Sequence, residues 1–519
     1  MLKRLPIGTQ EFEKLITKNL IYIDKTAFIY ELITSGSIYF LSRPRRFGKS
    51  LLISTLEALF SGKKDLFNGL WIQKNTDYAF PIYPVIKIDF SQIDTKTPET
   101  FTSDLKKILK EQAERYQIQL EDAGLSMMFR QLIQQVARIN NVVVLIDEYD
   151  KPLIDHLGKD IAIAMENREI LKTFYGILKG QDANLQFVLL TGVSKFSKVG
   201  IFSGLNQLND ITMDSQFAGM LGYTQTELEY YFKDHINELS DQLSQSKTDI
   251  LCNIRDWYNG YQFSDDDKIK VYNPFSTLNL FYKNRFAPHW FESGTPTFLI
   301  DLIKNQQYDI TVLEEYAVEV DMFSVYELEK INILPILVQT GYLTIKNKSG
   351  EIYTLGYPNY EVKNGFISYL STSLSLKPNE FRSSILQLVA AINKNDMDTF
   401  FDITKQIFLE IPYDIQLKEE KYYQSLWYLI IKMIGLKAAA EYKTNRGRVD
   451  MVVETTHSVY IFELKINKTP DDALAQIRKK GYADEFLNSN KTVYWIGVNF
   501  DLTIKNIESW KSIKQTPPS

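Results

Sequence analysis

The chain has 519 residues, more than one hydrophobic core normally serves, so we expect about three or four folded units. Hydrophobic residues make up 45% of the chain and aromatic residues 13%, which excludes a largely disordered protein. The formal net charge of −5 excludes binding of nucleic acid through overall charge, so any such contact needs a local basic patch.

The cysteine and histidine residues indicate the cellular compartment and bear on metal binding. Cys252 is the single cysteine, so no disulfide can form within the chain and a reducing compartment is favoured. The N-terminus lacks an apolar signal core, and no apolar run reaches transmembrane length. We therefore expect a cytoplasmic protein without a membrane partner. The four histidines have no metal-ligand spacing, which argues against a zinc site.

In chain order, the segment Tyr22–Thr26 comes before the first motif. Such a segment often packs beside the base of a bound nucleotide, but taken alone we interpret Asp24 and Lys25 as a surface ion pair.

Residues 38–56 contain the first motif with a chemical meaning. Ile38–Leu41 predicts a buried strand, a polar loop ends in Gly48-Lys49-Ser50, and apolar residues then recur at helical spacing. This is the setting of a P-loop, in which backbone N–H groups hold phosphate, the lysine reaches the outer phosphates and the serine binds Mg²⁺. The alternative is an ordinary helix start after a basic loop.

The loop departs from the usual P-loop pattern. Arg43 replaces the first glycine and Pro44 removes one N–H donor. Arg43, Arg45 and Arg46 could compensate, because a guanidinium binds phosphate oxygens in a bidentate way. We expect nucleotide contacts from Arg45, Arg46, Phe47, Gly48, Lys49, Ser50 and Leu51.

Three further buried strands are predicted in the first part of the chain, at Pro84–Phe90, at 141–147 and at Leu185–Leu190, with helices at 99–118 and 126–138. The second of these strands ends in Asp147-Glu148, at the carboxyl edge where open α/β sheets bind ligands. We expect Asp147 to hold Mg²⁺ and Glu148 to polarise the attacking water.

Polar residues after the strand at Leu185–Leu190 complete the predicted ATP site. Thr191 or Ser194, with Lys195, could lie between the acidic pair and the γ-phosphate, and Thr191 is our choice for contact with the nucleotide. One strand intervenes between the P-loop strand and the Asp-Glu strand, as in the additional-strand class of P-loop ATPases. The adjacent Asp147 and Glu148 also favour this class.

The middle of the chain predicts three units. Residues 215–324 are mostly helical, and we interpret the aromatic residues of 257–261 and 272–276 as packing rather than as base-stacking platforms. Residues 325–375 suggest a winged-helix-like unit, with strands at Thr340–Ile345 and Tyr353–Asn359 around a glycine turn. We favour interdomain packing over DNA contact for it, because its helix has few basic residues. Residues 376–415 predict a helical connector.

Residues 416–519 show a second chemistry. A helix at 418–436, three strands (Ala438–Tyr442, Arg448–Val453, Val459–Ile466), a helix at 470–487 and a strand at Thr492–Val498 give the order αβββαβ, which is the core of restriction-endonuclease-like folds.

The acidic and basic residues of this unit lie where a phosphodiesterase needs them. Asp450 lies on the second strand, and Glu463 and Lys465 share one face of the third. Carboxylates can hold Mg²⁺, and a lysine can orient water and stabilise developing negative charge. Glu420 could add a carboxylate. A surface ion pair of Glu463 with Lys465 is the alternative, but their apolar neighbours argue against it, because charges there are costly unless they are satisfied.

Together these motifs resemble the bacterial AAA-ATPase-like family that carries a C-terminal PD-(D/E)XK nuclease-like domain. The resemblance is carried by Leu5–Gly8, Tyr22–Thr26, Arg43–Ser50, Leu145–Asp150, Leu190–Lys195, Gly204–Asp210, Gly447–Asp450, Phe462–Lys465 and Ala475–Ala483. It implies that the arginine-rich loop is the family's usual form, that Gln476 lies beside the metal site and that Tyr482 lies near it. The stretch Glu420–Gln424 departs from the family, since Gln424 stands where a histidine is usual.

We therefore expect an α/β protein with a P-loop AAA-type domain (1–214), a helical lid (215–324), a winged-helix-like unit (325–375), a connector (376–415) and a nuclease-like domain (416–519). The expected function is an ATP- and Mg²⁺-dependent ATPase that controls a metal-dependent nuclease acting on nucleic acid, with DNA preferred, and the chain could form a homo-oligomer. One alternative is a nucleotide-switched signalling or interaction protein whose nuclease-like domain binds without cleaving. Another is an ATPase that remodels protein partners.

Overall fold

The structure is a computed structural model. It describes residues 2–195, 201–202, 205, 207–265, 269–294, 313, 316–319, 332–374, 378–409, 426–431, 434, 437–444, 447–455, 457–480, 486 and 491–515. The chain divides into two compact units, one made of Met1–Leu299 with Glu315–Val362 and the other of Ile300–Glu314 with Lys363–Ser519. The five predicted domain boundaries remain a prediction.

The first unit is built on a parallel five-stranded sheet. Its strands are β1 (Ile38–Ser42), β2 (Val85–Asp89), β3 (Val142–Asp147), β4 (Leu185–Gly192) and β5 (Asn209–Asp210), in the order β2-β3-β4-β1-β5. Every residue of β1 and β3 is buried, as continuous apolar runs predict for a central parallel strand. Strand β4 separates β1 from β3, which confirms the additional-strand arrangement.

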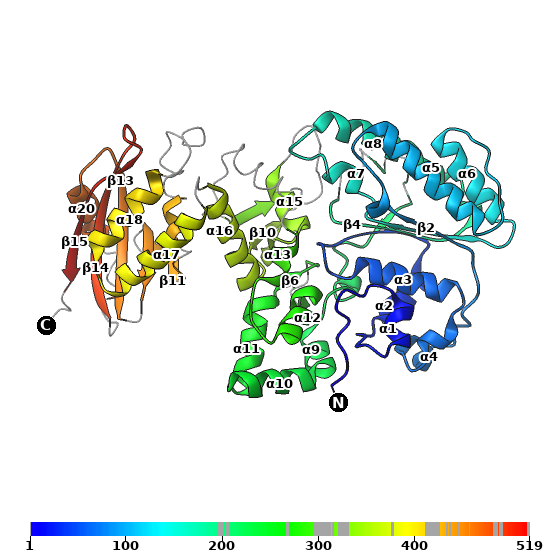
Figure 1. The fold of residues 1–519 in the computed structure, drawn as a ribbon, viewed down its shortest axis with the longest axis horizontal. Helices are drawn as coiled ribbons and strands as arrows, with labels where there is room; N and C mark the ends of the chain where they lie inside the picture. Colours follow the sequence, from blue (N-terminus) through cyan, green and yellow to red (C-terminus); the bar gives the residue numbers. More distant parts are fainter. Residues whose placement is uncertain are drawn as a thin grey trace. The chain divides into compact units, whose positions relative to one another are not determined.

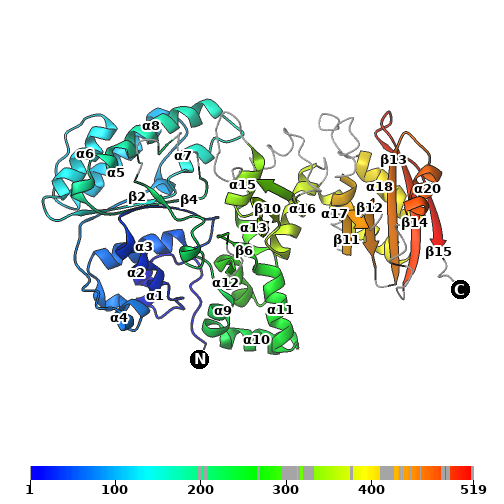
Figure 2. The same cartoon turned by 180° about the vertical axis from the view of Figure 1, so that it is seen from behind.

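Helices cover both faces of this sheet. On one face lie α5 (Pro98–Glu114), α6 (Leu125–Val136), α7 (Lys151–Ile154) and α8 (Ile161–Lys179), and on the other lie α1 (Phe12–Thr17), α2 (Thr26–Ser35), α3 (Lys49–Phe60) and α4 (Trp71–Asn75) (Figures 1 and 2). The P-loop strand and helix, β1 and α3, form where the sequence predicts them. The P-loop lies between them, at the carboxyl edge of the sheet.

A helical part follows the sheet in the first unit. It contains α9 (Gln225–Tyr231), α10 (Lys233–Leu243), α11 (Lys247–Tyr258), α12 (Pro274–Lys283) and α13 (His289–Gly294), with the short strands β6 (Tyr261–Gln262) and β7 (Lys270–Val271). Phe232, Tyr258, Tyr272 and Phe281 are buried in its core. Tyr258 and Tyr272 therefore pack as predicted, whereas Phe275 of the range 272–276 lines a cavity described below.

The predicted winged-helix-like hairpin is present, but its strands are displaced along the chain. Helix α15 (Ile333–Gln339) precedes β9 (Thr344–Ser349) and β10 (Ile352–Gly356), and β10 also pairs with the unpredicted strand β8 (Tyr316–Glu319). The prediction ended the first strand at Ile345. The strand instead runs to Ser349, because Gly350 at φ 60° makes a tight turn that lets Ser349 pair with Ile352.

Helices lead into the second unit. Helix α16 (Tyr360–Leu374) spans the division between the units. The residues predicted as a helical connector, 376–415, contain two helices, α17 (Pro378–Asn393) and α18 (Met397–Leu409). Asn395 at φ 56° ends the first, and the Asp396 carboxylate accepts the Thr399 N–H at the start of the second.

The second unit has a mixed five-stranded sheet. Its strands β11 (Lys437–Thr444), β12 (Gly447–Glu454), β13 (Ser458–Ile466), β14 (Thr492–Asp501) and β15 (Asn506–Gln515) lie in sequence order, with β13 and β14 parallel and the other neighbours antiparallel. Helix α20 (Pro470–Lys480) connects the parallel pair. The βββαβ order is confirmed, and Leu426–Ile431 is helical within the predicted first helix, but β15 was not predicted. Glu420, Gln424 and Tyr482 lie outside the described residues.

Candidate nucleotide and metal sites

The P-loop positions Lys49 at the first residue of α3. Gly48 at φ 97° and Arg46 at φ 69° adopt left-handed backbone conformations, which turn the loop sharply into the helix. The Lys49 Nζ donates to the carbonyl oxygens of Arg43 (2.8 Å) and Pro44 (3.0 Å), and burial lowers its pKa. The lysine is thus held across the loop that would receive phosphate.

Arg43 does not face this loop as a phosphate ligand. Its buried guanidinium donates to the carbonyl oxygens of Ser42 (2.9 Å) and Thr212 (2.6 Å) and lies 4.3 Å from the ring centre of Phe263. Burial lowers its pKa to about 9. Of the three arginines that we grouped for phosphate binding, Arg43 instead fixes the backbone in front of the loop.

Aromatic residues from the helical part support the P-loop from behind. The Phe47 ring packs edge-on against Tyr261 and Phe263, with centres 4.8 and 5.3 Å apart. The Trp290 indole N–H donates to the Arg45 carbonyl oxygen (3.1 Å). No sequence motif indicates these contacts, because the partners lie more than 200 residues apart.

A cavity of about 650 Å³ opens beside the P-loop. Its lining includes Arg45–Leu52 and Glu148, and also Pro6, Gly8–Gln10, Tyr22, Ile23 and Met220–Tyr223. The size suits a nucleotide. All of the predicted nucleotide residues from Arg45 to Leu51 line it, whereas Asp147 and Thr191 do not.

The interpretation of Asp24 with Lys25 as a surface ion pair is wrong. The Lys25 Nζ donates to Glu227 and to the Gly219 carbonyl oxygen (both 2.7 Å). The Asp24 carboxylate instead accepts the backbone N–H groups of Thr26 (2.9 Å) and Trp71 (2.6 Å). Lys25 therefore ties the N-terminal segment to α9 beside the nucleotide cavity.

The acidic pair and the predicted sensor residue meet at the ends of β3 and β4. The buried Thr191 hydroxyl donates to the Asp147 carboxylate (2.6 Å), which also accepts the Glu148 N–H (3.0 Å). Glu148 has a left-handed backbone, at φ 53°, and burial raises the pKa of its carboxyl group. A non-glycine residue in this conformation at a strand end is typical of a functional position.

Asp150 is a buried member of the site that the sequence did not single out. Its carboxylate accepts the N–H groups of Val193 (3.0 Å) and Ser194 (2.6 Å), and burial raises its pKa to about 6. Lys195 is paired with Asp210 (2.6 Å) and its N–H donates to Gln339 (2.9 Å). The backbone N–H of Ser194 and the side chain of Lys195 thus have structural partners, as does the Thr191 hydroxyl, and Thr191 stays the predicted sensor residue.

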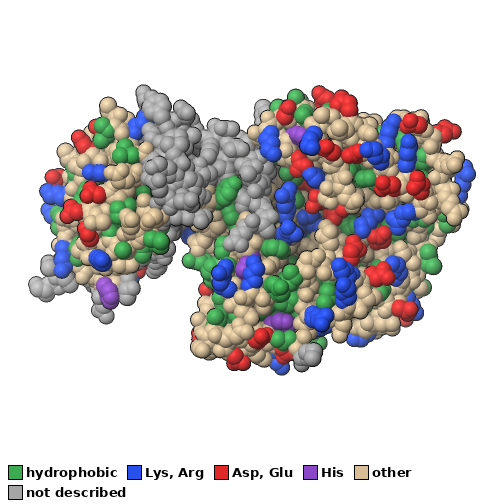
Figure 3. All heavy atoms as spheres, in the orientation of Figure 1, with side chains coloured by type: hydrophobic (Ala, Val, Ile, Leu, Met, Phe, Trp, Pro, Cys, Tyr) green, Lys and Arg blue, Asp and Glu red, His purple; other side chains and the backbone are tan. Residues whose placement is uncertain are grey.

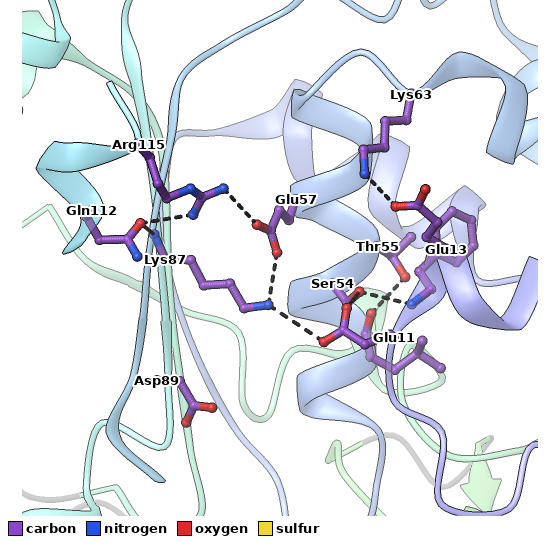
Figure 4. A network of polar contacts seen from close by, with 12 residues as sticks. Glu11, Glu13, Ser54, Thr55, Glu57, Lys63, Lys87, Asp89, Gln112 and Arg115 are labelled. Atoms are coloured by element: carbon purple, nitrogen blue, oxygen red, sulfur yellow. Dashed lines mark hydrogen bonds and ion pairs between the residues drawn. The ribbon is translucent and has the colours of Figure 1, made fainter. Parts of the chain in front are cut away.

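Polar contacts also hold α3 against its neighbours (Figure 4). Glu57 on α3 bonds Lys87 of β2 (2.9 Å) and Arg115 at the end of α5 (3.5 Å). Ser54 donates to Glu11 (2.8 Å). The helix that carries Lys49 is therefore attached to the sheet and to the N-terminal segment.

The second site lies on β12, β13 and α20 of the other unit. Asp450 accepts the Leu464 N–H (2.7 Å), and Glu463, with 1% of its surface exposed, accepts from Lys465 (2.8 Å). The Gln476 amide of α20 donates to the same Glu463 oxygen. The structure thus brings together four predicted residues, Asp450, Glu463, Lys465 and Gln476.

Gly497 is a residue of this site that sequence reasoning missed. It pairs with Glu463 across β13 and β14, and a Cβ atom there would lie 2.2 Å from the Pro470 carbonyl oxygen and 3.1 Å from Ala473. The absence of a side chain lets α20 approach the sheet and carry Gln476 to Glu463. A lone glycine in a strand is the signal that could have indicated this.

Both sites can be tested for their fit to Mg²⁺. Ser50 lines the cavity and Asp147 lies at the end of β3, and a hydroxyl with a carboxylate suits this ion. Asp450 and Glu463 supply two carboxylates, as many as Mg²⁺ commonly takes from a protein. Within the described ranges, no group of three or more His, Cys, Asp or Glu side chains is placed to hold a metal ion. Both donor sets fit a metal that keeps water or phosphate ligands.

On the face of the first unit that Figure 3 shows, lysine and arginine side chains are interspersed with acidic ones. No large patch of a single charge is therefore seen on this face. None of the helices in the described part of the chain is long and apolar enough to cross a membrane.

The fold is that of an AAA-ATPase-like P-loop unit joined to a restriction-endonuclease-like unit. Residues 6–202 match the family described as "Predicted AAA-ATPase", and residues 418–510 match the "PD-(D/E)XK nuclease superfamily". The chain is 36% identical over 523 residues to the "Uncharacterized protein in vnfD 5'region" of Azotobacter chroococcum mcd 1, covering 97% of this chain and 98% of that protein. The chain belongs to this AAA-ATPase-like family with a C-terminal PD-(D/E)XK domain, which confirms the resemblance and the predicted fold class.

Among solved structures, the ORC2 protein of Aeropyrum pernix (ADPNP-ADP complexes) is similar at 13% identity and a TM-score of 0.23, covering 72% of this chain and 97% of that one. A similarity of this size does not define the fold, which follows from the strand order.

Proposed function

We propose that the protein binds and hydrolyses ATP, and that its ATPase domain controls a Mg²⁺-dependent nuclease that cleaves DNA. The observation that carries the nuclease is the buried Glu463, held by Lys465 and Gln476 beside Asp450. A carboxylate with 1% exposure is costly unless a cation or hydrogen-bond donors satisfy it, and here two donors from different elements converge on one oxygen.

In the ATPase domain, Lys49 would contact the outer phosphates and Ser50 and Asp147 would hold Mg²⁺, which neutralises charge on the phosphates when bound. Glu148 would accept a proton from the attacking water, and its raised pKa suits a base. Thr191 would fix the Asp147 carboxylate through their 2.6 Å hydrogen bond. Arg45 and Arg46, which line the same cavity, would add positive charge around the phosphates.

In the nuclease domain, Asp450 and Glu463 would hold Mg²⁺, which polarises the scissile phosphate and lowers the pKa of bound water. Lys465 would orient the attacking water and stabilise negative charge as it develops. Gln476 would keep the Glu463 carboxylate in place. Glu420 stays a candidate for a further carboxylate.

The test is cleavage of supercoiled plasmid, single-stranded DNA and RNA by the purified full chain, with Mg²⁺ or EDTA and with or without ATP. We expect Mg²⁺-dependent nicking of plasmid that falls about 10²–10³-fold in Asp450→Asn, because one electrostatic stabiliser is lost. ATP hydrolysis by Asp450→Asn should match the wild type. Asp471→Asn is the control, since this exposed α20 carboxylate pairs with Lys511 and lies outside the four-residue site.

Lys49→Ala separates the two activities. We expect it to lose ATP hydrolysis, and any effect of ATP on cleavage should disappear with it. Nicking that survives EDTA and is equal in Asp450→Asn would contradict the nuclease assignment. Hydrolysis at the native rate by Lys49→Ala would contradict the P-loop assignment.

A second candidate is a nucleotide-switched protein whose PD-(D/E)XK domain binds DNA without cutting it. It is favoured by the two donors that Glu463 already has, Lys465 and Gln476, because they satisfy the buried carboxylate without a metal ion. Such a protein would hold DNA equally well in EDTA and would show intact ATP hydrolysis with no cleavage of any substrate.

A further inference from the structure

The first unit has a second cavity, of about 570 Å³, that shares no lining residue with the nucleotide cavity. It is formed by α2, both ends of α4 and the segment that follows α4. Its lining residues are Tyr30, Thr34, Trp71, Asn75, Thr76, Asp77, Tyr78, Ala79 and Pro81. Three of these nine residues are aromatic and one is charged, which is an unusual composition for a surface hollow.

The Tyr30 ring stands at a steep angle to each of the other two aromatic rings. The Tyr30 ring centre lies 6.2 Å from that of Trp71 with an interplanar angle of 55°, and 6.5 Å from that of Tyr78 with an angle of 84°. Rings at these angles are not stacked face to face, and a cation can bind within about 6 Å of the centre of a ring face.

Trp71 is held in place without being buried. Its backbone N–H donates to the Asp24 carboxylate (2.6 Å), yet 39% of the residue is exposed, unlike a core tryptophan. An indole is the aromatic side chain that attracts cations most strongly.

The charge of the cavity favours a cation. Asp77 is the one charged lining residue, it is exposed, and no ion pair engages it in the part of the chain that the structure describes. The nearby Lys74 is not a lining residue, and its Nζ lies beside Gly69, 4.0 Å from where a Cβ atom of that glycine would stand. No basic side chain therefore competes for the carboxylate inside the cavity.

Three further polar side chains of the lining are already bonded to the backbone. Thr34 donates to the Tyr30 carbonyl (2.7 Å), Asn75 to that of Trp71 (2.9 Å) and Thr76 to that of Ile72 (2.6 Å). The lining thus offers three aromatic side chains and one carboxylate, together with the hydroxyl groups of Tyr30 and Tyr78. A quaternary ammonium ion suits it, because its charge is spread over methyl groups that need no acceptor.

We propose that Tyr30, Trp71, Tyr78 and Asp77 form a binding site for a small quaternary ammonium compound. This site is independent of the proposed ATPase and nuclease functions, since it uses none of their residues.

The test is calorimetric titration of the full chain with choline, compared with 3,3-dimethyl-1-butanol, which has the same shape without the charge. We expect choline to bind at least about tenfold more tightly than the neutral alcohol. Trp71→Ala should weaken choline binding about tenfold or more, and Asp77→Asn should weaken it severalfold. Tyr78→Phe should bind like the wild type, because it keeps the ring face.

Tyr230→Ala serves as the matched control, since this tyrosine is 76% exposed and lies outside the cavity. Its choline affinity should equal that of the wild type, and the melting temperature of every variant confirms folding. Equal binding of choline and the neutral alcohol would overturn the proposal, as would an absence of binding or an unchanged affinity in folded Trp71→Ala and Asp77→Asn.

Discussion

Replacing Thr191 by valine tests the ATP site at its most specific contact. Valine has nearly the same shape as threonine, so the packing of this fully buried position is kept while the 2.6 Å hydrogen bond to Asp147 is lost. A hydrogen bond to a charged group contributes about 1.5–3 kcal/mol. At about 1.4 kcal/mol for each factor of ten, the loss corresponds to about ten- to hundredfold in the rate of hydrolysis.

The assay is the turnover rate of ATP hydrolysis, together with the dissociation constant of a fluorescent ATP analogue. We expect turnover to fall by that factor and affinity to change less than about threefold, because Thr191 orients the carboxylate and does not line the nucleotide cavity. Thr191→Ser, which keeps the hydroxyl, should retain most of the activity. A Thr191→Val protein with the native turnover rate would refute this reasoning.

Two further predictions concern stability. Burial raises the pKa of Asp150 from 3.8 to about 6, so the folded state binds the carboxyl proton more tightly than the unfolded chain does. The resulting contribution to the free energy of unfolding is complete below about pH 4 and is lost as the pH rises through 6. The loss amounts to about 3 kcal/mol, so the melting temperature of the wild type should fall relative to Asp150→Asn between pH 4 and pH 7.5, and parallel profiles would contradict it. Gly497→Ala should push α20 away from β14 and so destabilise the second unit by about 1–3 kcal/mol. DNA cleavage should fall with it, while ATP hydrolysis should not change. A variant with native stability and native cleavage would show that the helix can shift freely.

Much of the fold was predictable because buried parallel strands and P-loops have local signatures. The strand containing Val142–Asp147 is a continuous apolar run, and Gly48-Lys49-Ser50 joins a strand to a helix within a few residues. Alternation likewise indicated that Glu463 and Lys465 share a face, and they bond each other.

What could not be predicted depends on partners far away in the sequence. Arg43 resembles a phosphate ligand in the sequence, yet its guanidinium bonds the carbonyl of Thr212, 169 residues away. Lys25 is bonded to Glu227 rather than to its neighbour Asp24. Strand β15 was missed because it is an edge strand and contains polar residues such as Glu508 and Lys511. A strand of this kind needs no continuous apolar run, so the sequence carries no clear signal for it.

The contacts behind the P-loop determine how the ATPase domain must fold. Trp290 bonds Arg45 across 245 residues, and Gly341 lies so close to Pro44 that a Cβ atom would stand 2.8 Å from it. Contacts of such high sequence separation slow folding, because a long segment of chain must be ordered before they form. The loop can therefore reach its final shape only after residue 341 has been synthesised. A shortened protein ending at residue 214 would lose these supports, whereas one ending at 362 would keep them.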